Sequence, residues 1–257
     1  MGQNVLIVCD SFKENLNAFE VAEAIAQGIQ QVNQKVICTV MPFSDGGEGA
    51  LEVLHQNTKG HKVKSQSTDA LGHSITAEYF MFDKKPVAWI ELSQASGLEL
   101  IVPDLRNPRE TTTFGTGLLI KHAIKQGAKE IILGVGGSAT NDAGTGIIKA
   151  LGGQFLDVQG FALPNGGAAL SSLNQIILPQ YLEEIKWKVA CDVTNPLLGP
   201  QGATYTYGPQ KGASEKDLKT LERALKQFAH IVKKKTGKSI DTLPGGGAAG
   251  GTAAGLY

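Results

Sequence analysis

Glycine, small polar residues and acids gather in loops that directly follow short apolar runs of this chain. The sharpest case is the segment 134–144, GVGGSATNDAG, which follows the apolar run 131–133. In an open α/β sheet, ligands bind where parallel strands end, and N–H groups at a helix start can bind phosphate there. The candidates for phosphate contacts are Gly136, Gly137, Ser138, Thr140 and Asn141. Asp142 is a candidate Mg²⁺ ligand, because carboxylate oxygens suit this ion.

Acids and a lysine also follow the first two expected strands. The segment 10–13, DSFK, supplies Asp10 and Lys13, and the segment 44–49, SDGGEG, supplies Asp45 within a glycine-rich turn. Phosphoryl transfer needs cations near the moving charge and acids that hold Mg²⁺, and these residue types suit both tasks. Because consecutive strands are commonly neighbours in a sheet, both loops are expected to face one cleft. Taken singly, each loop is also typical of an ordinary turn or helix cap.

Two later loops add another acid and another lysine. The segment 190–196, ACDVTNP, ends an apolar run, and Asp192 at that place is a candidate general base toward a hydroxyl group. The segment 208–212, GPQKG, places Lys211 in a tight turn, which alone indicates little.

The glycine-rich loop leaves two other interpretations open. Residues 134–139 satisfy the relaxed dinucleotide pattern G-x-G-x-x-A, and Asp157 follows at about the distance of a ribose-binding acid. A nicotinamide-dependent dehydrogenase is therefore an alternative, and a purely structural glycine turn is another. Against the dehydrogenase, the loop does not open a domain, and several other loops also carry functional residue types. Neither a Walker A motif nor a G-x-S-x-G elbow occurs, so a P-loop nucleotidase and a serine hydrolase have no support.

The elements that must position these loops alternate between short apolar runs and amphipathic stretches, which predicts an α/β fold containing a parallel sheet. Expected strands cover residues 5–9, 35–42, 62–68, 74–82, 87–92, 130–135, 154–156 and 187–192. Expected helices cover residues 19–32, 51 to about 60, 112–126, 143–151 and 215–235, and another begins at residue 252. The three strands between residues 62 and 92 follow one another without a helix, which indicates a meander and the start of a second domain.

Bulk composition excludes several classes of partner. The chain has 24 basic and 24 acidic residues, so it lacks the basic excess of a protein that binds nucleic acid or a membrane surface. Its three cysteines, Cys9, Cys38 and Cys191, are scattered and form no CxxC pair, which predicts a reduced, cytoplasmic protein. No apolar stretch approaches the ~20 residues that span a bilayer.

Taken in order, six of these segments resemble the bacterial type I glycerate kinases. They are DSFK at 10–13, SDGGEG at 44–49, GVGGSATNDAG at 134–144, ACDVTNPLLGP at 190–200, GPQKGA at 208–213 and PGGGAAGG at 244–251. ASGLELI at 95–101 and Asn107-Pro108 fit as well. Any one motif is weak, but six in the right order, from the first strand to the last residue, are specific.

The resemblance implies transfer of the γ-phosphoryl group of ATP to D-glycerate, with Mg²⁺. It also implies two α/β domains, one Rossmann-like with a parallel sheet and the other a mixed α/β domain inserted into it, with the active site between them. Residues 1–64 are then the first part of the Rossmann-like domain, and residues 65–257 form the second. The remainder of the first domain is expected beyond residue 257, so the chain is expected to lack a C-terminal segment.

The resemblance also suggests roles for individual residues. Asp192, Lys13 and Asp45 are the expected catalytic residues, with Asp192 orienting or deprotonating the attacking hydroxyl. The substrate contacts are expected from Ser11, Gly46, Gly47 and Asn195, with Lys13 also holding the carboxylate. ATP phosphates are expected on the loop 136–141 and on Lys211, and Mg²⁺ on Asp45 or Asp142.

Several points stay open at this stage. Neither the choice between the 2- and 3-hydroxyl of glycerate nor the oligomeric state follows from the sequence, and a homodimer is one option. Besides the dehydrogenase that uses residues 134–139, a non-catalytic domain that binds a small acid remains an alternative. The expected partner is a small molecule, D-glycerate, with no nucleic acid and no membrane.

Overall fold

The computed structural model of the protein describes residues 3–12, 15–44 and 49–257. Its strands are β1 (Asn4–Ile7), β2 (Ile37–Val40), β3 (Gly60–Thr68), β4 (Ser74–Phe82), β5 (Val87–Glu91), β6 (Glu130–Gly134), β7 (Gln154–Leu156), β8 (Gln175–Ile177) and β9 (Lys186–Ala190). Its α-helices are α1 (Ala18–Val32), α2 (Ala50–Asn57), α3 (Ser93–Ser96), α4 (Phe114–Lys125), α5 (Thr145–Ala150), α6 (Ala203–Tyr207), α7 (Glu215–Thr236) and α8 (Ala248–Gly255). Four short 3-10 helices are η1 (Pro103–Leu105), η2 (Gly167–Ser172), η3 (Gln180–Glu184) and η4 (Pro209–Lys211).

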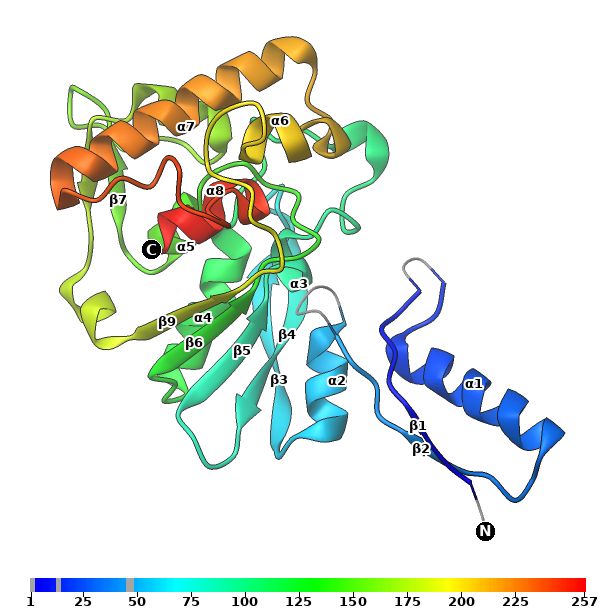
Figure 1. Ribbon diagram of the computed structural model, residues 1–257. Helices are drawn as coiled ribbons and strands as arrows, with labels where there is room; N and C mark the ends of the chain where they lie inside the picture. Colours follow the sequence, from blue (N-terminus) through cyan, green and yellow to red (C-terminus); the bar gives the residue numbers. More distant parts are fainter. Residues whose placement is uncertain (1–2, 13–14, 45–48) are drawn as a thin grey trace.

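The first three elements form a small β–α–β unit. β1 pairs with β2 in parallel, and Asn4 lies opposite Ile37. α1 begins at a capping box in which the Asn17 side chain accepts backbone N–H groups of the first turn while Glu20 accepts the Asn17 N–H. One face of this helix packs on Ile7, so the two strands are covered on one side. In Figure 1 this unit, in dark blue, lies beside the main body and is joined to it through α2.

The main body is built on a five-stranded sheet in the order β3-β4-β5-β6-β9. β3, β4 and β5 form the antiparallel meander that the sequence predicts. β5, β6 and β9 then run parallel, so the mixed α/β fold predicted from the sequence is confirmed. The carboxyl ends of these three parallel strands lie at one edge of the sheet.

Both faces of the sheet are covered because successive side chains of a strand point to opposite sides. On β5, Ile90 joins the large core that also holds Leu119 of α4 and Ile147 of α5. Its neighbour Trp89 faces the other way and packs with Phe80 and with Leu51 of α2. α7 lies over the far side of the large core, as Figure 1 shows in orange.

The observed elements bear on two predicted boundaries. The boundary predicted after residue 64 falls inside β3, which pairs with β4 from Gly60 to Thr68, whereas a boundary between β2 and α2 would leave this strand whole. α8 spans Ala248–Gly255, but Ala249, Gly250 and Gly251 have left-handed conformations, so regular helical backbone follows them at Thr252, where the sequence predicts it. The division into two domains itself stays a prediction. No helix among the described residues is long and apolar enough to span a bilayer.

Candidate functional site

The register of the parallel strands aligns three chain segments at the carboxyl edge of the sheet. Glu91, the last residue of β5, lies opposite Gly134, which lies opposite Ala190 at the end of β9. Three segments follow these strand ends. They are the helix α3 after β5, the glycine-rich loop 135–144 after β6 and the segment 191–200 after β9. Two of the loops predicted to carry chemistry, with Asp192 in the second, therefore start side by side.

The tip of the glycine-rich loop is open to a ligand. Gly137 is exposed and has φ of 66°, a left-handed conformation that favours glycine. The Gly137 carbonyl accepts the N–H of Leu98 at 2.8 Å, which fixes the tip against the segment after α3. Within the described ranges, the N–H groups of Gly136, Gly137 and Ser138 have no protein acceptor. Three such donors in sequence can receive an anion, so the tip fits a phosphate group.

A cavity of about 310 Å³ adjoins this tip. Gly137 lines it together with Ser93, Gln94 and Gly97 of the α3 region. The cavity contains polar and apolar surface, and it opens at the same carboxyl edge as β5 and β6. The loop tip is thus one wall of a recess that can hold a small molecule.

Behind its tip the loop is buried and fixed by a lysine from a distant segment. Lys211 is 2% exposed, and its Nζ donates to Ser138 Oγ and to the Thr140 carbonyl, each at 2.7 Å. Burial lowers the pKa of Lys211 to about 7, and the nearby Asp142 carboxylate opposes this shift. The structure therefore brings together three residues that we predicted as ATP ligands, but Lys211 lies in the interior.

Thr140 and Asn141 are also fully buried. The Asn141 amide donates to Thr204 Oγ1 at 3.3 Å, while Asn141 Oδ1 and Thr140 Oγ1 have no partner in the described part of the chain. Direct contact between ATP and these two side chains, or Lys211, does not fit this burial. Their contacts instead shape the loop that carries the exposed tip.

Asp142 has contacts that differ from those of a metal ligand. Its Oδ2 accepts the N–H of Thr113 at 2.9 Å, the hydroxyl of Thr113 at 3.0 Å and the hydroxyl of Thr112 at 3.3 Å. It also accepts the N–H of Gly146, while Oδ1 accepts the N–H of Gly144 at 3.1 Å. This fully buried carboxylate ties the loop to the start of α4 and α5. Its lone pairs are directed at protein donors, so the predicted Mg²⁺ contact does not fit.

The glycine-rich segment before α8 completes the support of the loop. The N–H of Ala143 donates to the Gly250 carbonyl at 3.1 Å. A Cβ atom on Gly250 would lie 2.0 Å from the Thr140 carbonyl, so only glycine allows this approach. Ala143 and Ala249 both have φ of 51°, which is costly for alanine. Two glycine-containing segments that are far apart in the sequence are therefore in close contact here.

The segment after β9 exposes Asp192, as expected for a residue that acts on a substrate. Asn195 was predicted as a substrate contact, but both ends of its amide bind protein. Its Nδ2 donates to the Gln201 carbonyl at 2.8 Å, and its Oδ1 accepts the hydroxyl of Tyr207 at 2.8 Å. Burial raises the pKa of Tyr207, and the charge of Asp192 adds to this rise. Asn195 therefore holds the turn that presents Asp192.

Of the N-terminal candidates, Ser11 can be placed, whereas Lys13, Asp45, Gly46 and Gly47 lie outside the described residues. The N–H of Ser11 donates to Asp10 Oδ1 at 2.6 Å. Ser11 and Asp10 line a cavity of about 40 Å³ with Gly49 and Glu52 of the α2 region. The first loop thus meets the outer face of α2.

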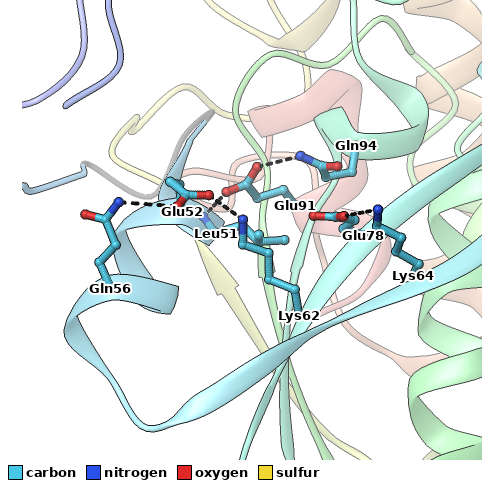
Figure 2. A network of polar contacts seen from close by, with 8 residues as sticks. All are labelled: Leu51, Glu52, Gln56, Lys62, Lys64, Glu78, Glu91 and Gln94. Atoms are coloured by element: carbon cyan, nitrogen blue, oxygen red, sulfur yellow. Dashed lines mark hydrogen bonds and ion pairs between the residues drawn. The ribbon is translucent and has the colours of Figure 1, made fainter. Parts of the chain in front are cut away.

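The sequence reading missed Glu91, which is buried at the carboxyl edge itself. Its signal was an acid that ends an otherwise apolar strand. Glu91 Oε1 accepts the N–H of Leu51, and Oε2 accepts Gln94 Nε2 at 3.4 Å (Figure 2). Burial raises the pKa of Glu91, and these hydrogen bonds oppose the rise.

The dinucleotide alternative fails on topology. Its ribose acid, Asp157, follows β7, which pairs antiparallel with β8 in a separate two-stranded sheet. Asp157 Oδ1 accepts the N–H groups of Gln159 and Phe161 at 2.8 and 2.9 Å and so closes a turn. The parallel neighbours of β6 are β5 and β9 instead, so the β–α–β unit expected from β6 to β7 does not form.

Comparison with known proteins agrees with this arrangement. The model of the glycerate kinase family matches residues 5–257. This chain belongs to the glycerate kinase family. A glycerate kinase of Bacillus subtilis (strain 168) is 45% identical over 250 residues, which cover 96% of this chain and 65% of that protein. The glycerate 2-kinase of Escherichia coli (strain K12) is 42% identical over 98% of this chain and 67% of its own length.

A solved structure leads to the same family. The crystal structure assigned as glycerate kinase 2 from Salmonella typhimurium LT2 superposes with a TM-score of 0.88 at 42% sequence identity. The match covers 100% of this chain and 70% of that one. The chain thus spans about two thirds of the length of its curated glycerate kinase relatives.

Proposed function

We propose that this chain carries the glycine-rich and acidic loops of an ATP-dependent glycerate kinase, which transfers the γ-phosphoryl group of ATP to a hydroxyl of D-glycerate. The observation that carries the proposal is the carboxyl edge of β5, β6 and β9. There, a loop exposed at Gly137, whose N–H groups at residues 136–138 have no acceptor among the described residues, starts beside the segment that exposes Asp192. Membership of the glycerate kinase family supports this assignment.

In this proposal the tip at Gly136, Gly137 and Ser138 binds ATP phosphate through backbone N–H groups. Lys211 and Asp142 do not contact ATP in this proposal. Their hydrogen bonds on the buried side of the loop keep it in the shape that presents these donors. Catalysis then depends on positioning and charge stabilisation, as for phosphoryl transfer in general. Lys13, Gly46 and Gly47 stay predicted contacts of the glycerate carboxylate.

Asp192 is the proposed general base or orienting group for the attacking hydroxyl. It is exposed at the carboxyl edge, and Asn195 and Tyr207 hold the turn that follows it. A carboxylate in this place can accept a hydroxyl proton as the oxygen attacks the phosphoryl group.

Mg²⁺ is expected for phosphoryl transfer, where one or two carboxylates and the substrate phosphates usually hold it. No group of three or more His, Cys, Asp or Glu side chains in that part of the chain is arranged to hold a metal ion. Asp142 is saturated by protein donors. Asp45 remains the predicted ligand.

The test is an assay of ADP formation with ATP, Mg²⁺ and D-glycerate, run on residues 1–257 and on the full product of the gene. We expect glycerate-dependent ADP formation by the full product. In that protein, Asp192→Asn should lower kcat by about two to four orders of magnitude, because the substitution removes the proton acceptor. Phosphorus NMR distinguishes the products, since phosphate at the 2-position couples to one carbon-bound proton and phosphate at the 3-position to two.

The matched control is Asp83→Asn, because Asp83 is exposed in the turn before β5, at the opposite edge of the sheet. It should leave kcat unchanged. A well-folded full product that forms no ADP would refute the kinase assignment, and a normal kcat for Asp192→Asn would remove Asp192 from the role of base.

A further inference from the structure

Glu91 stands out as a buried carboxylate with a backbone partner in a distant helix. It is 1% exposed, and it closes β5 in the same row as Gly134 of the glycine-rich loop. Its Oε1 accepts the N–H of Leu51 in the first turn of α2, as Figure 2 shows. The contact joins the edge of the sheet to a helix residue that lies 40 positions earlier in the chain.

The N-cap residue of α2 makes no side-chain hydrogen bond to the first turn of the helix. This residue is Gly49, which has φ of 86° and provides no side chain to accept the orphan N–H groups of the helix. Such groups cost free energy when they are buried without an acceptor. Glu91 supplies an acceptor from β5, so a contact with the sheet helps to set the position of the helix start.

α2 connects two parts of the candidate site. Its inner residues, Ala50 and Leu51, pack with Phe80 and Trp89 of the sheet. Its outer face, at Gly49 and Glu52, lines the small cavity with Ser11 and Asp10. Any shift of the helix start therefore moves the surface against which the first loop lies.

On the other side of Glu91, the contact with Gln94 leads to the cavity beside Gly137. Glu91 thus lies between the start of α2 and the recess at the loop tip. Figure 2 shows the carboxylate of Glu91 between Leu51 and Gln94.

We propose that Glu91 is a positioning residue, which fixes the start of α2 to the carboxyl edge of the sheet and thereby aligns the segment at Ser11 with the loops after β6 and β9. The proposal rests on the proposed glycerate kinase function. Glu91 acts on the glycerate side of the site, where Ser11 is a predicted substrate contact. The loop tip proposed for ATP is held separately by Lys211 and Asp142. Glu91 therefore affects glycerate more than ATP.

The test compares Glu91→Ala, Glu91→Gln and Glu91→Asp in the full product of the gene. Glu91→Ala removes the acceptor, and we expect kcat/KM for D-glycerate to fall about 10- to 100-fold, since misplacement by about 1 Å can cost this much. KM for ATP should change less than about twofold. Glu91→Gln retains an acceptor oxygen for the Leu51 N–H and should restore kcat/KM to within about threefold of wild type. Glu91→Asp shortens the reach and should give a weaker form of the defect, which keeps the test available if Glu91→Ala does not fold.

A second readout does not depend on activity. Hydrogen exchange of residues 1–257 should show faster exchange at the start of α2 in Glu91→Ala than in wild type, with no change in the glycine-rich loop. The matched control is Glu222→Ala, because Glu222 is also a buried carboxylate that accepts a backbone N–H, from Gly199 at 2.9 Å. It should lower stability without the selective loss toward glycerate.

The outcomes separate the two proposals. An inactive wild-type protein would refute the proposed kinase and with it the kinetic role, while exchange at α2 would still decide whether Glu91 anchors the helix. With an active wild type, the inference is overturned by a normal kcat/KM in Glu91→Ala, by equal losses toward ATP and glycerate, or by the same selective loss in Glu222→Ala.

Discussion

Several polar side chains of this protein make their contacts deep in the core. Among them, Lys211 has a contribution to stability that can be tested by changing the pH. Its Nζ is enclosed by Ser138 and the Thr140 carbonyl, and burial lowers its pKa from 10.5 to about 7. Between these two pH values the unfolded chain binds more protons at Lys211 than the folded protein does. Stability should therefore rise with pH in this window, by up to about 1.4 kcal/mol per pH unit for one proton.

Lys211→Met should remove this dependence. Urea unfolding at pH values from 7 to 9 would give the difference in stability between wild type and variant, which we expect to grow with pH in favour of wild type. Lys219→Met, at an exposed position of α7, should show a constant difference. Parallel stability curves for wild type and Lys211→Met would show that Lys211 keeps its proton throughout this range.

At the scale of the element, α7 shows how local sequence fixes a helix boundary. Ser214 and Asp217 form a capping box, in which Ser214 Oγ accepts the N–H of Asp217 and Asp217 Oδ2 accepts the N–H of Ser214. The helix ends at Gly237, which has φ of 76°. Both signals are readable in the sequence, and the predicted helix 215–235 agrees with the observed Glu215–Thr236.

Ser214→Ala should lower the free energy of unfolding by about 1 kcal/mol, because the first turn loses an N-cap acceptor. Urea unfolding would measure this change. Thr220→Ala, in the body of the same helix, is the control and should be within about 0.5 kcal/mol of wild type. An equal effect of both substitutions would contradict the capping role.

Other elements could not be predicted because distant segments determine them. The glycines of residues 244–251 indicate an irregular segment before the regular part of α8, but no local pattern indicates the left-handed conformation of Ala249. Gly250 and Gly251 follow the contour of the loop at Thr140 and Ala143. Distant segments also determine part of the candidate site. The exposed tip and Asp192 could be predicted from glycine and acid positions after apolar runs, whereas the burial of Asp142 and Lys211 depends on partners elsewhere in the chain.

At the scale of the whole molecule, the protection of backbone amides against hydrogen exchange should differ between the two sheets. β1 and β2 form a sheet of two strands whose outer face exposes Leu6 by 61% and Ile37 by 63%. The five-stranded sheet is covered on both faces by α2 and by the large core. Small sheets with few buried contacts open more readily than larger ones.

Hydrogen exchange of residues 1–257 should therefore be faster in β1, α1 and β2 than in β5, β6 and β9. Mass spectrometry of peptides from these segments would measure the difference. Equal protection in both regions would show that the β–α–β unit is as stable as the main sheet.

The sequence distance between the glycine-rich loop and its supports has a consequence for synthesis on the ribosome. Lys211 lies 73 residues after Ser138, and Gly250 follows later still. At about 5–20 residues per second, the loop leaves the exit tunnel several seconds before the residues that fix its shape. Strands β3 to β6 can pair during that interval, but the loop conformation proposed to bind phosphate must wait for α8. In the nascent chain, the competence to bind nucleotide should thus appear after the sheet that carries it.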